Sequence, residues 1–327
     1  MTGRPTTAAR RGRARVLDAG SAQLPASVDG SPGRGDRISV RKTYKLYIGG
    51  AFPRTESGRA YAVHGAKGEL LANASRGTRK DIREAVRAAR KAQPGWAGKT
   101  AYNRSQILYR IAELMEGRRE QFIAEVMASE GISRARSARA VDAAIDRWVW
   151  YAGWADKITQ VLGTVNPVGA SYFDFTIPEP TGVVGIVAPE SSSLLGLVSR
   201  VAPVVVGGNA CVVLASESRP LPAVTLSEVL ATSDVPGGVI NVITGHRREL
   251  VPTLASHMDV NALDTWGVDT DALEDVERAA FDNMKRLARA PRGRAERFDW
   301  LDDRQAERPE WISAFLEMKT VWHPIGV

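Results

Sequence analysis

Apolar residues in the first part of the chain recur at the spacing of amphipathic helices. The first such segment opens with Thr78 and Asp81, three residues apart, a variant of the capping box that starts helices. Two longer segments with the same periodicity follow it. The three segments predict helices at residues 78–96, 107–126 and 137–158. Short runs at 45–52 and 60–63 precede these helices and predict a hairpin-like β entry.

From about residue 180 the pattern changes to short, wholly apolar segments that alternate with helical ones. The apolar segments at 182–187, 210–214 and 239–243 are typical of strands buried on both faces. Helical segments at 194–206 and 221–232 separate them. Buried strands that alternate with helices form parallel sheets. The sequence therefore predicts an α/β protein with a Rossmann-like, doubly wound parallel sheet.

The positive charge is concentrated at the N-terminus. The chain carries a formal net charge of +7, and its first 42 residues hold nine basic and three acidic residues, a net +6. This leader is rich in Gly, Ser, Pro, Ala and Thr and has no hydrophobic period, so we expect it to be disordered. A basic tail can bind nucleic acid, but no aromatic residue lies among these arginines to stack on bases. A solvated leader is the favoured interpretation, and nucleic acid is not an expected partner.

The remaining composition limits location and chemistry. No apolar run approaches the length of about 18–20 residues that a membrane-spanning helix needs, so a membrane is not an expected partner. The single cysteine, Cys211, excludes a disulfide within the chain, and a cytoplasmic location is expected. Cys211 lies in an apolar strand, where burial raises the pKa of a thiol, so we expect a core residue and no nucleophile. The four histidines lack metal-ligand spacing, so no metal site is expected.

Several motifs occur in the order and spacing of one enzyme family. An early one is the helix end Pro94-Gly-Trp96, and a late one is the segment from Glu317 to Gly326. Between them lie Glu179-Pro180, Gly182-Val-Val-Gly185, Ala202-Pro203, Gly208-Asn209 and the run from Val235 to Gly245. Together these motifs resemble the aldehyde dehydrogenase superfamily. The resemblance implies that family's cofactor-binding domain and a small β oligomerisation element, in relatives that oxidise aldehydes with NAD(P) and a cysteine nucleophile.

The resemblance implies cofactor contacts at the carboxyl ends of the strands, but the residues there depart from the family pattern. Ser191 stands where the family has the Asn that donates to the oxyanion, and a serine hydroxyl cannot reach the same oxygen. Ala215 replaces a lysine that holds the cofactor ribose, and Glu217 is one residue out of register and points elsewhere. Arg247 and Arg248 could meet a phosphate, but we interpret them as a solvated helix start. The degenerate cofactor site then consists of Val187, Pro189, Ala215, Glu217, Gly245 and Gly267.

The family's catalytic domain, with its nucleophilic Cys and general-base Glu, is missing. Only residues 269–310 occupy that part of the sequence. They predict a polar helix at 273–288, with Met284 on its apolar side, and then a charged linker with Trp300 and Trp311. The expected organisation is a disordered basic leader (1–43), a cofactor-binding-like domain (44–268), a helix and linker in place of the catalytic domain (269–310) and a C-terminal oligomerisation strand (311–327).

Three hypotheses about function follow. The first is a catalytically inactive aldehyde dehydrogenase-like protein, a pseudoenzyme without bound cofactor, that acts as a structural or regulatory subunit of an oligomer with a full-length NAD(P)-dependent aldehyde dehydrogenase. The second is an NAD(P)-dependent oxidoreductase acting on aldehydes, with the catalytic Cys supplied by a partner. The third is a nucleic-acid or surface-binding accessory protein that acts through the Arg-rich leader.

The first hypothesis is favoured because of the strand from Glu317 to Ile325. In a monomer we expect this apolar strand to be unpaired, and exposed strand edges bind further strands. The expected partners are therefore a full-length aldehyde dehydrogenase subunit or a second copy of this chain. The isolated chain is expected to self-associate.

Overall fold

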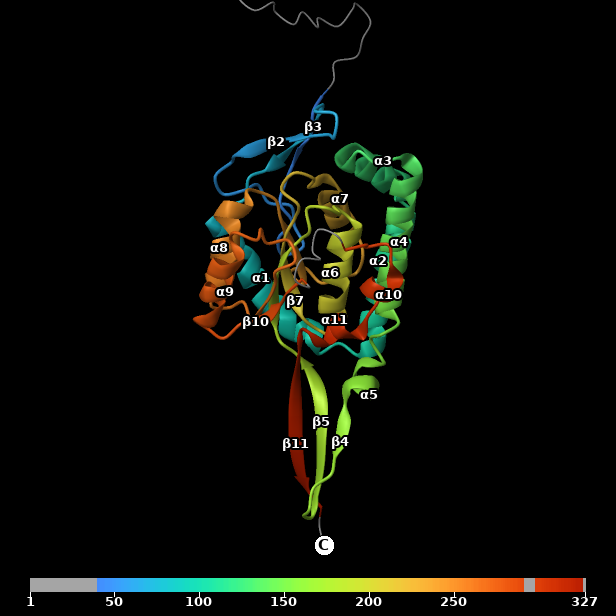
Figure 1. The fold of residues 1–327 in the computed structure, drawn as a ribbon, viewed down its shortest axis with the longest axis vertical. Helices are drawn as coiled ribbons and strands as arrows, with labels where there is room; N and C mark the ends of the chain where they lie inside the picture. The colour runs from blue at the N-terminus through green and yellow to red at the C-terminus, as the bar shows by residue number, and fades with distance from the viewer. Residues whose placement is uncertain (1–39, 291–297, 326–327) are drawn as a thin grey trace, which may run out of the picture. The chain divides into compact units, whose positions relative to one another are not determined.

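The structure of the chain, a computed structural model, describes residues 40–290 and 298–325. The expected leader, at 1–43, lies almost entirely outside the described residues, as do residues 291–297 of the expected linker. From Arg41 onward the described residues belong to one compact unit. They form three β-sheets with helices packed around them (Figure 1). None of the described helices is both long and apolar enough to cross a membrane.

A five-stranded parallel sheet forms the centre of this unit. Its strand order is β10-β9-β6-β7-β8, and each neighbouring pair of strands runs parallel. The strands are β6 (Val183–Val187), β7 (Ala210–Leu214), β8 (Ile240–Ile243), β9 (Ala262–Asp264) and β10 (Arg286–Ala288). The predicted doubly wound parallel sheet is confirmed.

Side chains along each strand alternate between two hydrophobic cores, one on each face of this sheet. On β6, Val184 and Ile186 belong to one core, and Val183 and Val187 to the other. The first core lies under α6 (Leu195–Val206) and α7 (Leu221–Leu230), and the second under α1 (Arg79–Ala97), α8 (Arg247–Ser256) and α9 (Leu273–Phe281) (Figure 1). Because α6 lies between the sheet and a further helical layer, it is buried on all sides and is wholly apolar apart from Ser199 and Arg200.

The helices before the sheet begin and end at local signals. Thr78 and Asp81 form the complete capping box at the start of α1, as predicted. Each of the two longer predicted helices is divided into two helices. Gly117 ends the first helix of one pair, and Gly153 ends the first helix of the other. The resulting helices are α2 (Ala101–Glu116), α3 (Arg119–Glu130), α4 (Arg134–Ala152) and α5 (Ile158–Leu162).

The β entry differs from the prediction. Strands β1 (Thr43–Tyr44), β2 (Ala60–His64) and β3 (Leu70–Ser75) form a sheet of order β1-β3-β2, so the partner of β2 is the unpredicted β3. The predicted pairing of 45–52 with 60–63 is wrong. That run folds back on itself between Ile48 and Ala51, and Tyr47 bridges to Val242 of β8. Long-range pairing with the central sheet therefore overrides the local hairpin pattern.

The helix predicted at 273–288 is also wrong in its last part. α9 ends at Phe281, and after Met284, whose φ is +54°, the chain forms β10 beside β9. Met284 is 90% exposed and does not belong to an apolar helix side. The edge of β9 offers unpaired backbone groups, and pairing with them stabilises a strand that a helical pattern would not reveal.

Residues 298–315, which include Trp300 and Trp311 of the expected charged linker, pack on α4 and α6. They form α10 (Asp303–Ala306) and α11 (Pro309–Ser313). The buried Arg200 guanidinium lies over the rings of Trp266 and Trp311, 5.0 and 4.8 Å from their centroids, and its Nε donates to Asp264 at 2.6 Å. We name residues 298–315 the cap, because they cover the helices on that face.

Hydrogen bonds from α4 hold the cap in place. The fully buried Arg147 donates through Nη2 to Asp303 at 3.0 Å and to the Trp300 carbonyl at 3.4 Å. The Tyr151 hydroxyl donates to the Ala306 carbonyl at 3.1 Å. A buried guanidinium is stable only when its donors find such acceptors, so α4 and the cap depend on each other.

A third sheet contains the strand expected to be unpaired. β11 (Leu316–Pro324) pairs antiparallel with β5 (Tyr172–Pro180) along its whole length, and β4 (Thr164–Asn166) lies on the other side of β5. The expectation of an unpaired strand in the monomer is therefore wrong, because β5 offers a matching edge within the same chain. The second edge of β11 has no partner strand in the described part of the chain. In Figure 1 these strands extend away from the helices.

A buried carboxyl group lies where β1 meets α3 and α7. Glu125 Oε1 accepts hydrogen bonds from Thr225 at 2.8 Å and Gln121 at 3.1 Å, whereas its buried Oε2 has no partner among the described residues. Burial raises the pKa of Glu125 to about 7. The nearby Glu228 differs: burial raises its pKa, but hydrogen bonds and ion pairs with Lys42 and Arg118 outweigh burial and lower it below its usual value.

The substitution Glu125→Gln is expected to stabilise the protein at pH 8. Between pH 4.5 and about 7 the folded state keeps a proton that the unfolded state releases, so the free energy of unfolding falls as pH rises through this window. Above it, the glutamine variant is expected to be more stable by on the order of 2–3 kcal/mol. Most of that difference should vanish at pH 5. Urea unfolding at the two pH values measures it.

Glu228→Gln is the matched control, because its carboxylate is stabilised in the charged form. Loss of the Glu228 charge should lower the free energy of unfolding at pH 8, whereas Glu125→Gln should raise it. Equal shifts for Glu125→Gln at pH 5 and pH 8 would contradict the proposed titration of Glu125.

Candidate functional site

The carboxyl ends of the central strands meet at one edge of the sheet, where open α/β folds bind ligands. The loops after β6, β7, β8 and β9 all reach this edge, which we call the carboxyl edge. The structure brings all the sequence-predicted cofactor positions together there: Val187, Pro189, Ala215, Glu217, Gly245 and Gly267.

Two of these positions need glycine because backbones approach closely. A Cβ at Gly267 would lie 2.1 Å from the Ala188 carbonyl oxygen, and the Gly267 N–H donates to the Val187 carbonyl at 3.0 Å. Gly245 has a φ of +148°, and a Cβ there would lie 2.9 Å from the Gly77 nitrogen. Close backbone packing therefore explains why glycine occupies both positions, without a bound ligand.

Arg247 fills the centre of the carboxyl edge. Its Nη1 donates to the Gly267 carbonyl at 2.6 Å, and its Nη2 contacts the Ala188 carbonyl and lies 2.8 Å from the Glu190 carboxylate. Arg247 is only 6% exposed, so its interpretation as a solvated helix start is wrong. The neighbouring Arg248 is exposed, as that interpretation requires. One guanidinium thus joins the loops after β6 and β9.

The Glu190 carboxylate joins this guanidinium to the loop after β7. It accepts hydrogen bonds from the Glu217 N–H at 2.6 Å and from the hydroxyls of Ser216 and Ser218 at 2.7 and 2.6 Å. Burial alone would raise the pKa of Glu190, but the Arg247 charge and these hydrogen bonds outweigh it and lower the pKa below its usual value. Glu190 therefore stays ionised at neutral pH.

A second carboxylate, that of Glu217, lies at the N-terminus of α8. Its Oε2 accepts from the Arg247 N–H at 2.8 Å, and its Oε1 lies 2.7 Å from His246 Nδ1. The first N–H groups of a helix carry partial positive charge and attract anions. In this chain a carboxylate of the protein itself occupies that position.

Two clefts flank the Arg247 side chain. One, of about 500 Å³, lies over the carboxyl edge and is lined by Pro189, Ser191, Ser218, Arg219, Gly267 and Asp269, among others. The other, of about 270 Å³, lies between α8 and α9 against apolar residues such as Val251, Val268 and Val276. Arg247 lines both clefts, as do Gly267, Val268 and Asp269.

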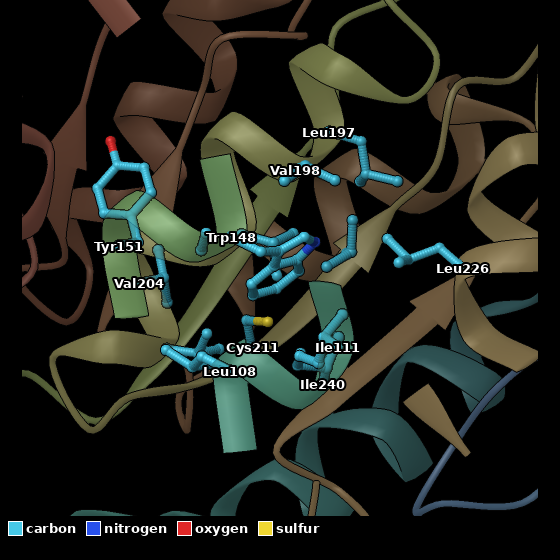
Figure 2. Packing of buried hydrophobic residues seen from close by; sticks show 14 of the residues in the cluster. Leu108, Ile111, Trp148, Tyr151, Leu197, Val198, Val204, Cys211, Leu226 and Ile240 are labelled. Carbon is cyan, nitrogen blue, oxygen red and sulfur yellow. The ribbon is translucent and has the colours of Figure 1, made fainter. Parts of the chain in front are cut away.

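Candidate nucleophiles at this edge have structural roles. Cys211 lies inside β7 among Leu108, Ile111 and Trp148 (Figure 2), and burial raises its pKa, which confirms a core residue. The Ser192 hydroxyl accepts from the Gly196 N–H at 2.9 Å in the first turn of α6. The N-cap of this helix is Leu194, so no serine of the run is the N-cap residue, and Ser192 binds the first turn from two residues before Leu194. Ser191 is exposed. The described residues contain no group of His, Cys, Asp and Glu that could hold a metal ion.

The pairing of Glu190 with Arg247 was not apparent from the sequence, although a topological signal existed. Glu190 follows β6 and Arg247 follows β8, and both strands flank β7 in the sheet. Because β6 and β8 lie on either side of β7, charged residues that follow these two strands can meet beyond the end of β7. The sequence order alone separates them by 57 residues and hides this proximity.

Comparisons with known proteins agree on one family. A model described as the aldehyde dehydrogenase family matches residues 53–293. Aldehyde dehydrogenase family 2 member B4 of Arabidopsis thaliana is 33% identical over 245 residues, 74% of this chain and 45% of that protein. Human retinal dehydrogenase 2 is 31% identical over 277 residues, 83% of this chain and 52% of that protein.

Solved structures share the fold. HpcC from Thermus thermophilus superimposes with a TM-score of 0.72 at 29% identity, covering 76% of this chain and 48% of that one. The NAD+ complex of an aldehyde dehydrogenase from Bacillus cereus gives 0.72 at 24% identity, with 76% and 50% coverage. The chain spans about half the length of the curated relatives it matches.

Substitution of Arg247 by leucine is expected to destabilise the fold strongly. The change leaves the Glu190 carboxylate without its charge partner and two loop carbonyls without a donor, so the free energy of unfolding should fall by about 3–5 kcal/mol. Arg248→Leu is the control, one residue away and exposed, and should change it by no more than about 0.5 kcal/mol. Urea unfolding of the two variants tests this. Similar losses for both would show that the buried contacts of Arg247 do not stabilise the fold.

Proposed function

This chain belongs to the aldehyde dehydrogenase family, and we propose that it acts as a non-catalytic subunit that assembles with a full-length aldehyde dehydrogenase. It has a structural or regulatory role in that complex. The observation that carries the proposal is an uncovered apolar face on the sheet of β4, β5 and β11, beside the open edge of β11.

The register of this sheet assigns its side chains to two faces. Residues directly opposite each other share a face, so Val165, Phe175 and Val321 form one row across the three strands. Phe173 and Ile177 flank this row on the same face, with His323 and Lys319 of β11 directly opposite them. Val165 is 69% and Phe173 44% exposed. This apolar face has no cover among the described residues.

The opposite face of the same sheet is mixed. The Thr176 and Thr320 hydroxyls lie 2.9 Å apart, and Asn166 donates to Asp174 at 2.8 Å. Tyr172 and Trp322 on this face pack edge to face with each other and remain partly exposed. Hydrogen-bonded rows are stable in water, whereas the continuous row of Val165, Phe175 and Val321 gains free energy when a partner covers it.

The partner that we propose is a full-length family member. A partner that pairs with the free edge of β11 can extend the sheet and cover its apolar face at the same time. A second copy of this chain is the other occupant, and the experiment below distinguishes the two.

Chemistry by the chain itself is not part of this proposal. Its sole cysteine is enclosed in the core, and Glu190 and Glu217 occupy the positions where a bound anion would lie. We therefore propose that the chain holds no NAD(P). The retained sheet and the NAD+ complex of the Bacillus cereus relative favour the alternative, an oxidoreductase that binds NAD(P) and uses a partner's cysteine.

Light scattering of the chain alone, and after co-expression with a full-length aldehyde dehydrogenase from the same source, tests the proposal. A mixed complex is expected, with NAD-dependent turnover that requires the full-length subunit. Calorimetric titration of the isolated chain with NAD+ should show no binding. A complex of copies of this chain alone would identify self-association instead. A monodisperse monomer that forms no mixed complex would reject the proposal, and tight NAD+ binding would favour the oxidoreductase.

Phe173→Glu is expected to weaken the mixed complex by roughly tenfold or more, since a charge on the apolar face cannot be buried without a partner. Met318→Glu is the matched control, because Met318 is 50% exposed on the opposite face of the same sheet. The dissociation constants of the two variants are compared by analytical ultracentrifugation. Equal weakening by both substitutions would contradict docking on the apolar face.

A further inference from the structure

The Glu190 carboxylate makes the contacts that a bound oxyanion makes in other α/β proteins. Its oxygens accept from one backbone N–H, two hydroxyls and a guanidinium, and one further N–H, that of Ser218, lies 3.4 Å away. Backbone N–H groups, hydroxyls and an arginine at the carboxyl edge of a parallel sheet are the groups that hold phosphate oxygens. All of these donors already point at one anionic group of the chain.

The guanidinium has further hydrogen-bonding capacity. Arg247 is only 6% exposed, and its Nε is buried without a partner among the described residues. A buried donor of this kind is destabilising unless an acceptor reaches it. A larger anion with more oxygens than one carboxylate could satisfy it better than Glu190 does.

The position of Glu190 is adjustable. It lies in the loop after β6, and its carboxylate is about one third exposed, 36%, at the rim of the cleft over the carboxyl edge. The backbone N–H and the two hydroxyls that it contacts belong to the loop after β7, and the guanidinium belongs to α8, so these donors are carried by elements other than the loop of Glu190.

We infer that Glu190 is an internal ligand that occupies an oxyanion site of the pyrophosphate type and keeps that site closed. The site consists of the Glu217 N–H, the Ser216 and Ser218 hydroxyls and the Arg247 guanidinium. Because Glu190 is ionised at neutral pH, its charge also repels an incoming anion. This inference deepens the proposed absence of NAD(P) binding, which rests on the same carboxylate, and it does not depend on the proposed assembly with a full-length subunit.

Pyrophosphate binding to the full-length chain tests this inference. Glu190→Ala frees the donors, so the variant is expected to bind pyrophosphate roughly tenfold or more tightly than the unchanged protein, and to show a higher Tm in its presence. Isothermal titration and thermal unfolding, both at constant ionic strength set with sodium chloride, measure the two effects. ADP is titrated in parallel: equal affinity indicates a site for phosphate groups alone, and higher affinity indicates a nucleotide, both of which support an opened site.

Glu249→Ala is the matched control. Glu249 is an exposed carboxylate near the start of the same helix, paired with Arg76 outside the site, so this variant should bind pyrophosphate no better than the unchanged protein. Glu190→Gln removes only the charge and keeps the shape, and serves if the alanine variant does not fold. The inference is overturned if the folded Glu190 variants bind no more tightly than Glu249→Ala. It is also overturned if the unchanged protein already binds pyrophosphate as tightly as they do.

Discussion

The contacts of one guanidinium organise the carboxyl edge of the central sheet. Parallel strands end in loops whose carbonyls and charges gather at one edge and need partners. Arg247 is that partner for the loops after β6 and β9, and through Glu190 it also fixes the loop after β7. Glu217 in turn caps α8, the helix that carries Arg247. The loops, the helix start and the ion pair therefore depend on one another, and the edge is ordered by residues of the chain itself.

A second guanidinium has a similar role on the opposite side of the core. Arg200 lies over two tryptophan rings and pairs with Asp264, and it joins α6 to the cap. Together with Arg147 it links the cap to the helix faces that the cap covers. These cation–π contacts and charge pairs offset part of the desolvation cost of the two guanidiniums, and Arg147 Nη1 is left without a hydrogen-bond acceptor among the described residues. The cap thus gives α4 and α6 a cover in a chain that spans half the length of its relatives.

The sequence predicts well what the burial of continuous apolar segments determines. Strands β6 and β7 are wholly apolar, β8 is apolar apart from the buried Asn241, and all three were located to within a residue, as was the capped start of α1. Strand β10 was not predicted, because its stability comes from the edge of β9. Strand β3 was not predicted either, although it forms a local hairpin with β2, which directly precedes it in the sequence. Arg247 and Arg248 are adjacent and locally equivalent, yet only the first faces the sheet edge. The candidate site could therefore be located from the sequence, but its occupation by the chain's own charges could not.

The pairing of β11 with β5 has a consequence for how the protein is made. Thr176 and Thr320, which face each other across the two strands, lie 144 residues apart in sequence. At the usual rate of synthesis, on the order of ten seconds pass between the appearance of the one strand and the other. During that interval β5 emerges from the ribosome with an open edge and an apolar face. Any subunit that binds this sheet competes, in that period, with the chaperones that recognise such surfaces on growing chains.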